Sequence, residues 1–189
     1  VQVSKYDQFE VYPYAVVLEP NTNSATIQEE ENQFTLITED VKCFVQKSPF
    51  RVRFENRNGE LLNADDDNFG VSWLAEEVTC YKQLADDEIF LGLGEKTGGL
   101  NRRGSSFTNW NTDAFGFNND TDPLYVSTPF YIGVREGKPY GIFFDNTHKS
   151  HFNFGASNNN RFAYFSAEAG DMNYYFIQGD NVGEIIQHY

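Results

Sequence analysis

The stretch that decides the fold runs from Ile89 to Gly155 and begins IFLGLGEKTGGLNRRG at residues 89–104. It continues with WNTD at 110–113, DPLY at 122–125, PFYIG at 129–133 and YGIFFDN at 140–146. A short apolar run therefore enters a long segment rich in Gly, Asn and Arg, whose glycines permit positive φ and close backbone approach. Such long loops in compact domains are usually functional or disordered. This one carries four aromatic residues, unlike a disordered linker, so we expect it to pack on something.

The residues on either side of this loop predict short strands and tight turns. Leu124–Val134 and Tyr140–Phe144 flank Glu136-Gly137, which is typical of a hairpin. Arg161–Ala167 and Met172–Ile177 predict a second hairpin around residues 168–171.

Alternation of apolar and polar residues continues towards the N-terminus. Val1–Leu18 predicts one or two edge strands around Pro13, because proline cannot donate to a strand ladder. Val41–Gln46 and Phe50–Phe54 alternate as half-buried strands do, and Asn58-Gly59 suits a type I′ turn.

Further along, Val71–Leu84 predicts two strands or one bent strand. Near the C-terminus, Asn181 is placed to cap a short helix through residues 184–187. Many short strands, frequent turns and almost no helical periodicity together predict an all-β sandwich or barrel.

Composition narrows the classes of partner. The 189 residues favour one domain, and the net charge of −14 argues against nucleic acid and anionic membranes, which bind basic patches. Aromatic residues make up 16% of the chain; they offer faces for sugar rings but also fill β cores. No apolar run is long enough to span a bilayer. The chain begins at Val1 rather than at a methionine, so the sequence leaves undecided whether the protein is exported.

Several residues that could carry metal or acid chemistry have structural interpretations. Asp65–Asn68 could hold calcium, but without the spacing of an EF-hand loop we expect a solvated turn. Glu95 could pass for a catalytic acid, and we expect it to pair with Arg102 or Arg103. His148 and His151 lie three apart in a strand-rich segment, where such residues point to opposite faces. Cys43 and Cys80 lack a metal or redox spacing, and Cys43 is predicted to be a buried thiol. We therefore predict no metal and no cofactor.

Six motifs in order carry a family resemblance. They are GLGEKT (92–97), RRG (102–104), WNTD (110–113), DPLY (122–125), PFYIG (129–133) and GIFFDN (141–146). In this order and spacing they resemble the N-terminal domain of glycoside hydrolase family 31, the α-glucosidase and α-xylosidase family. The match is dense from Ile89 to Gly155 and continues more weakly to Tyr189. Before Ile89, only the general pattern of the sequence agrees with the family, without individual motifs.

The resemblance implies an antiparallel β-sandwich of the galactose-mutarotase-like kind over residues 1–189, with at most a short C-terminal helix. In the family, two catalytic aspartates lie in a (β/α)8 barrel that follows the sandwich. This chain has no alternating strands and helices, so we expect no catalytic residue in it and no activity from it alone. The implied role is a non-catalytic domain of a retaining, α-glucosidase-like enzyme, whose partners are its own barrel and an α-linked oligosaccharide.

The resemblance also implies a carbohydrate contact. In the family, a loop of the sandwich folds over the mouth of the barrel, and the WNTD element aligns Trp110 and Asp113 with it. An ionised carboxylate accepts charge-assisted hydrogen bonds from two sugar hydroxyls, so Asp113 is the first candidate, followed by Trp110 and Phe115. Asp113 could instead cap its own turn. Ala114 stands where relatives often carry proline, which puts the loop shape in question.

Two other classes of protein stay open. A free-standing carbohydrate-binding module would bind oligosaccharide by itself, through exposed aromatics on a sandwich. An aldose epimerase would need a His and a Glu as acid and base; only His148, His151 and His188 are available, none in a recognisable epimerase motif, and likeness of fold alone does not carry function.

Overall fold

The computed structural model describes residues 1–6, 8–9, 14–17 and 25–189, and it is almost entirely β. Its strands form three antiparallel five-stranded sheets. The first sheet has the order β1 (Gln2–Val3), β15 (Met172–Gln178), β12 (Lys138–Phe144), β11 (Ser127–Arg135) and β9 (Ile89–Gly94). The second has the order β10 (Ser106–Asn109), β13 (Ser150–Asn153), β14 (Phe162–Ala167), β8 (Glu77–Gln83) and β7 (Val71–Leu74). The third has the order β2 (Thr26–Glu29), β3 (Gln33–Ile37), β4 (Val41–Gln46), β5 (Arg51–Asn56) and β6 (Leu61–Ala64).

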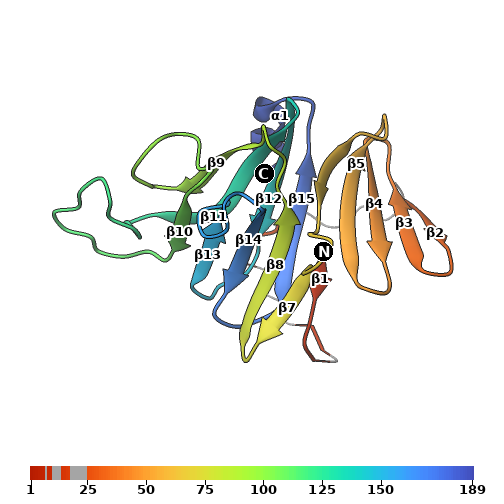
Figure 1. Ribbon diagram of the computed structural model, residues 1–189, viewed down its shortest axis with the longest axis horizontal. Helices are drawn as coiled ribbons and strands as arrows, with labels where there is room; N and C mark the ends of the chain where they lie inside the picture. The colour runs from red at the N-terminus through yellow and green to blue at the C-terminus, as the bar shows by residue number, and fades with distance from the viewer. Residues whose placement is uncertain (7, 10–13, 18–24) are drawn as a thin grey trace.

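The first two sheets pack face to face, and the third lies beside them (Figure 1). Aromatic rings fill the space between the first two: Phe144 of β12 lies 5.1 Å from Phe165 of β14, centroid to centroid. The third sheet joins this core through Phe54, which stacks on Phe176 at 3.9 Å. The predicted antiparallel β-sandwich is confirmed.

Helix α1 (Val182–His188) covers the outer face of the first sheet. Ile185 packs there with Phe130, Ile132 and Phe143, so β11 and β12 are buried on both faces. Asn181 is the N-cap, and its side chain accepts a hydrogen bond from Glu184 N at 3.1 Å. The predicted short C-terminal helix and its cap are confirmed.

One predicted hairpin is confirmed and another is wrong. β11 and β12 pair through a turn in which Glu136 and Gly137 have φ of 50° and 76°. Strands β14 and β15 do not pair, because β14 belongs to the second sheet and β15 to the first. The link over residues 168–171 crosses between the layers. Phe165 and Tyr174 then meet across the core at 5.6 Å instead of lying side by side in one sheet.

Two turn and strand predictions need smaller corrections. β5 and β6 form the expected hairpin, but of Asn58 and Gly59 only Gly59 has positive φ, so the turn is not type I′. The N-terminal prediction is met in part by β1, which pairs with β15; Pro13 lies outside the described residues. Val71–Leu84 forms two paired strands, β7 and β8.

The acidic turn at Asp65 is not solvated as predicted. Asp65 is 3% exposed, and its carboxylate accepts hydrogen bonds from Lys82 Nζ at 2.7 Å and Val52 N at 2.8 Å. Asp66 is also buried and holds the turn by accepting from Asn68 N. The charge of Asp65 is therefore balanced by a buried lysine inside the core. Both cysteines are free thiols, Cys80 buried and Cys43 half-buried.

Among the residues that the structure describes, no helix has the length and apolar character needed to cross a membrane.

Candidate functional site

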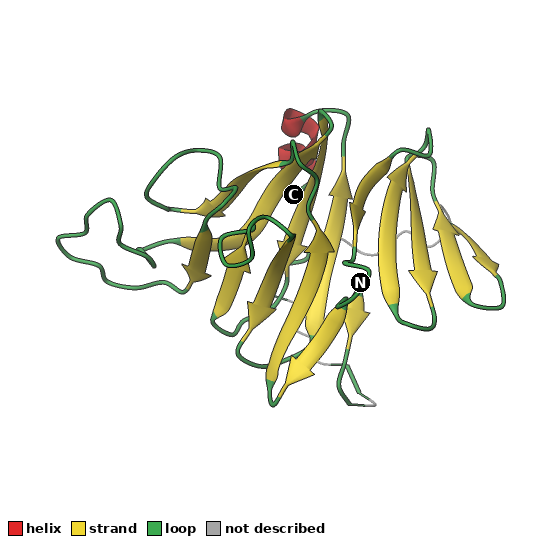
Figure 2. Cartoon of the chain, viewed as in Figure 1, coloured by secondary structure: helices red, strands yellow, loops and turns green. Residues whose placement is uncertain are grey.

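The loop over residues 110–126, between β10 and β11, projects from the packed sheets (Figure 1). A second loop, over residues 95–105, leaves β9 on the same side, and neither forms a helix (Figure 2). These loops contain most of the residues that the sequence singled out. We call residues 110–126 the projecting loop.

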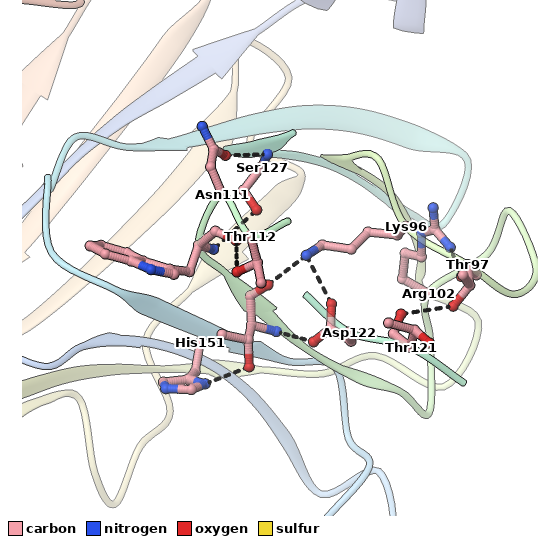
Figure 3. Close-up of polar contacts among 11 residues, drawn as sticks. Lys96, Thr97, Arg102, Asn111, Thr112, Thr121, Asp122, Ser127 and His151 are labelled. Atoms are coloured by element: carbon pink, nitrogen blue, oxygen red, sulfur yellow. Dashed lines mark hydrogen bonds and ion pairs between the residues drawn. The ribbon is translucent and has the colours of Figure 1, made fainter. Parts of the chain in front are cut away.

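The base of the projecting loop is held by a buried lysine (Figure 3). The side chain of Lys96 is 1% exposed, and its Nζ donates to Asp122 Oδ1 at 2.9 Å and to the carbonyl oxygen of Thr108. The other carboxylate oxygen of Asp122 accepts from Thr108 N. Burial lowers the pKa of Lys96, and the ion pair with Asp122 opposes that shift. Lys96 therefore ties β10 to the far end of the projecting loop, and we call these contacts of Lys96, Thr108 and Asp122 the clasp.

Further contacts close the two ends of the projecting loop onto each other. Trp110 N donates to Ser127 Oγ at 3.0 Å, and Ser127 N donates to Asn111 Oδ1 at 2.8 Å. Thr112 N donates to the carbonyl oxygen of Leu124 at 2.9 Å. Ordering a loop costs conformational entropy. These hydrogen bonds offset that cost and give the base of the loop a fixed geometry.

The three predicted site residues lie close together in sequence but differ in exposure. Asp113 is exposed, and its carboxylate accepts no hydrogen bond from any residue that the structure describes. The alternative that Asp113 caps its own turn is therefore wrong. Trp110 is 50% and Phe115 96% exposed. An exposed carboxylate without a partner can accept hydrogen bonds from hydroxyl groups.

The aromatic residues of the projecting loop make few contacts within the part of the chain that the structure describes. Phe107 packs against the core, but Phe115 contacts little, and Phe117 and Tyr125 meet mainly each other at 6.3 Å. With Val126, which is 55% exposed, they form an apolar surface. A patch of this kind usually marks an interaction site.

The prediction that Glu95 pairs with an arginine is wrong. Within the described ranges, Glu95 takes part in no ion pair, and it is exposed at the end of β9. Arg102 donates instead to the carbonyl oxygens of Thr97 and Gly99 at 2.9 and 2.8 Å. Arg103 donates to the carbonyl oxygens of Ala85 and Glu88. Both arginine side chains therefore bind backbone carbonyl oxygens instead of Glu95.

The two histidines do not converge. Nδ1 of His151 lies 3.2 Å from Thr108 Oγ1, and Nδ1 of His148 lies 3.2 Å from Asn146 Oδ1. Among the described residues, no three His, Cys, Asp or Glu side chains form a group that could hold a metal ion.

Sequence reasoning missed the clasp. Lys96 and Asp122 belong to the GLGEKT and DPLY motifs, but they lie 26 positions apart, and no local pattern predicts that they touch. A lysine in a Gly-rich loop is normally interpreted as solvated; only the buried position of its side chain reveals its role.

Residues 1–153 match the family model of the glycosyl hydrolase 31 N-terminal galactose mutarotase-like domain. The chain belongs to this family. It is 40% identical over 176 residues to α-glucosidase 2 of Bacillus thermoamyloliquefaciens, covering 93% of this chain and 22% of that protein. It is 26% identical to an α-xylosidase of Lactiplantibacillus pentosus, covering 92% of this chain and 21% of that protein.

Solved structures extend the comparison of this GH31 N-terminal domain. The Flavobacterium johnsoniae GH31 dextranase, in a complex with glucose, is 41% identical with a TM-score of 0.81, covering 87% of this chain and 20% of that one. A mutant of the same dextranase is complexed with isomaltotriose, and its TM-score is also 0.81. The chain thus spans about a fifth of the length of these relatives.

Proposed function

We propose that this chain acts as the non-catalytic N-terminal domain of a longer, retaining α-glucosidase-like enzyme that hydrolyses O-glycosyl bonds. The observation that carries the proposal is 40% identity to an α-glucosidase across 93% of this chain. The catalytic carboxylates are supplied by a (β/α)8 barrel outside these 189 residues, and the chain alone is inactive.

The projecting loop gives the domain its part in the reaction. Its apolar surface, made by Phe115, Phe117, Tyr125 and Val126, packs on the barrel, and Asp113 and Trp110 face the substrate. Asp113 carries a charge without a partner among the described residues, so sugar hydroxyls can donate to both of its oxygens. Trp110 and Phe115 supply ring faces for the sugar or for the rim of the barrel. The substrate class is an α-linked oligosaccharide.

The first test is to extend the coding sequence past Tyr189. We expect several hundred codons of alternating strands and helices with two aspartates at the ends of barrel strands. A stop codon directly after Tyr189 would overturn the proposal and favour a free-standing carbohydrate-binding module, for which the exposed aromatics of the projecting loop are suited.

The second test concerns Asp113 in the full-length enzyme. Asp113→Ala removes an exposed carboxylate that no described residue needs, so the melting temperature should stay within about 1 °C of wild type, because exposed substitutions change stability little. Activity on an α-glucoside should fall by about tenfold or more, since each charge-assisted bond contributes about 1.5–3 kcal/mol. Asp120→Ala, in the same loop and also exposed, is the matched control. Wild-type activity of Asp113→Ala would show that the loop does not contact substrate.

A further inference from the structure

The tip of the projecting loop, residues 113–120, has little support from the sheets. Within the part of the chain that the structure describes, its hydrogen bonds run only to other residues of the same loop, such as the bond from Phe117 N to the carbonyl oxygen of Ala114 at 3.1 Å. Phe115 is 96% exposed and packs on almost nothing. The position of Asp113 is therefore set by the residues at which the tip meets the rest of the domain.

Two contacts fix the ends of the tip. Beside Asp113, Thr112 N donates to the carbonyl oxygen of Leu124 at 2.9 Å, and Leu124 is 2% exposed. Two residues before Leu124, both carboxylate oxygens of Asp122 are bound in the clasp. Asp113 is thus one residue away from a hydrogen bond whose acceptor segment, residues 122–124, is held in place by Lys96.

The loop that carries Lys96 is itself fixed to the core. We call residues 95–105 the supporting loop. The guanidinium group of Arg102 donates to two backbone carbonyl oxygens of this loop, at 2.9 and 2.8 Å (Figure 3). Its central carbon lies 5.2 Å from the ring centre of Phe107, which packs against the core. The supporting loop is therefore a firm base from which Lys96 can hold another segment.

The ion pair of the clasp is shielded from solvent. The side chain of Lys96 is 1% exposed and that of Asp122 is 23% exposed, and salt screens such a pair less than it screens a surface pair. Without the ammonium group, the carboxylate of Asp122 keeps only the hydrogen bond from Thr108 N. The tip would then be ordered in a smaller fraction of molecules. A ligand binds with an apparent affinity that is reduced by that fraction.

We propose that Lys96 is a positioning residue for substrate: through Asp122 it holds the projecting loop in the conformation in which Asp113 accepts hydrogen bonds from sugar hydroxyls. The inference rests on the proposed function for the contact between Asp113 and the sugar. It assigns the supporting loop to the substrate-binding machinery without any direct contact with substrate. Lys96 acts on KM and not on the chemical step, because the order of the loop decides how many molecules are ready to bind.

Lys96→Met tests the proposal in the full-length enzyme, because it removes the charge and keeps an unbranched side chain. The values of kcat and KM are measured with p-nitrophenyl α-D-glucopyranoside and with isomaltotriose. We expect KM to rise about tenfold while kcat stays within about twofold of wild type. Partial unfolding would instead lower the apparent kcat and leave KM unchanged, so the two parameters separate positioning from a loss of stability.

A second variant changes the other partner of the ion pair. Asp122→Asn keeps the shape of the side chain and an acceptor for Thr108 N, so KM should rise less, by about threefold. The double variant should have the KM of Lys96→Met, because both changes break the same interaction. Lys138→Met removes a partly exposed lysine from another ion pair and is the matched control, with kcat and KM as in wild type.

A double-mutant cycle shows whether Lys96 acts through Asp113. In the Asp113→Ala background, Lys96→Met should change KM by less than about twofold, because the contact that it positions is already gone. An equal rise of KM in both backgrounds would overturn the proposal, since Lys96 would then act independently of Asp113.

The remaining outcomes separate the positioning role from the proposed function. An unchanged KM in Lys96→Met, or a fall in kcat alone, would overturn the positioning role and leave the α-glucosidase-like function intact. Hydrolysis of neither substrate by wild type would overturn the proposed function, and this inference with it.

Discussion

Glu88, in the turn between β8 and β9, is a carboxyl group with no exposed surface. Tyr140 donates to its Oε1 at 2.6 Å, and Ala85 N donates to its Oε2 at 3.0 Å. Arg135 NH1 lies 4.0 Å away, too far for a hydrogen bond. Burial raises the pKa of Glu88 above its ordinary value of 4.5, and the hydrogen bonds from Tyr140 and Ala85 oppose that rise only in part.

This raised pKa predicts a pH-dependent stability. The folded protein holds the Glu88 proton more tightly than the unfolded chain, so the contribution of Glu88 is fully present below the unfolded pKa and is lost as the pH rises through the folded pKa. Glu88→Gln removes the ionisation. Between about pH 4 and pH 7, wild type should lose stability relative to Glu88→Gln by about 1.4 kcal/mol for each pKa unit of the shift.

Urea unfolding of both proteins across that range measures the difference. Glu77→Gln, an exposed glutamate on β8, is the control and should show no such trend. A stability difference between wild type and Glu88→Gln that stays constant with pH would contradict the prediction.

At the scale of elements, two devices shape the projecting loop: the close approach of β9 to β11 and the clasp. Gly92 has φ of +116°, and a Cβ there would lie 2.7 Å from the carbonyl oxygen of Phe130. Glycine at this position therefore lets β9 approach β11 closely enough to pair. This is the close backbone approach that the glycines of the 89–104 stretch were expected to permit. Because of this pairing, Lys96, which follows β9, lies where its ammonium group contacts both Thr108 of β10 and Asp122.

Replacing Lys96 should loosen the projecting loop and leave the sheets intact. Lys96→Met keeps the length of the buried chain but removes the charge, so Asp122 loses its ion-pair partner. We expect a loss of about 2 kcal/mol, the usual contribution of a hydrogen bond to a charged group. Amide exchange at Thr108 and Thr112 should speed up, while exchange in β12 and β14 should not change.

Hydrogen exchange followed by NMR or mass spectrometry checks this expectation. Lys138→Met, which removes a partly exposed pair with Glu60 and Glu136, is the matched control and should leave the loop amides as they are. Unchanged exchange at Thr112 in Lys96→Met would show that the clasp does not order the loop.

At the scale of the whole molecule, the projecting loop carries several exposed apolar side chains within a short segment. Phe115, Phe117, Tyr125 and Val126 are 96%, 51%, 39% and 55% exposed. The rest of the surface carries most of a net charge of −14, which keeps molecules apart through repulsion. Contact between copies of the isolated chain is therefore expected at the projecting loop.

Phe115→Ser should reduce self-association of the isolated chain without changing its stability. The ring is almost wholly exposed, so its removal should change the free energy of unfolding by less than about 0.5 kcal/mol. Sedimentation velocity at rising concentration and high salt, where charge repulsion is screened, reports the association. Leu74→Ser, at another residue that is 80% exposed, is the control. Equal association of wild type and Phe115→Ser would show that this surface is not adhesive.

The sequence by itself determined the fold class, the β11–β12 hairpin and the capped helix, because each rests on residues close together in the chain. It also determined the family, because six short motifs occur in a fixed order. Alternation, turn residues and an N-cap act over a few positions. The order of the six motifs located the projecting loop and its candidates, Asp113, Trp110 and Phe115.

Only the tertiary structure decided which residues meet across long separations. Lys82 and Asp65 lie 17 positions apart and Lys96 and Asp122 lie 26 apart. Asp65, which was expected in a solvated turn, is buried against Lys82, and the side chain of Lys96 is buried against Asp122. The same holds for β14 and β15, which follow each other in the chain yet belong to facing sheets. Strand patterns specify which side of a strand is apolar, but the choice of neighbour depends on how all three sheets share one core.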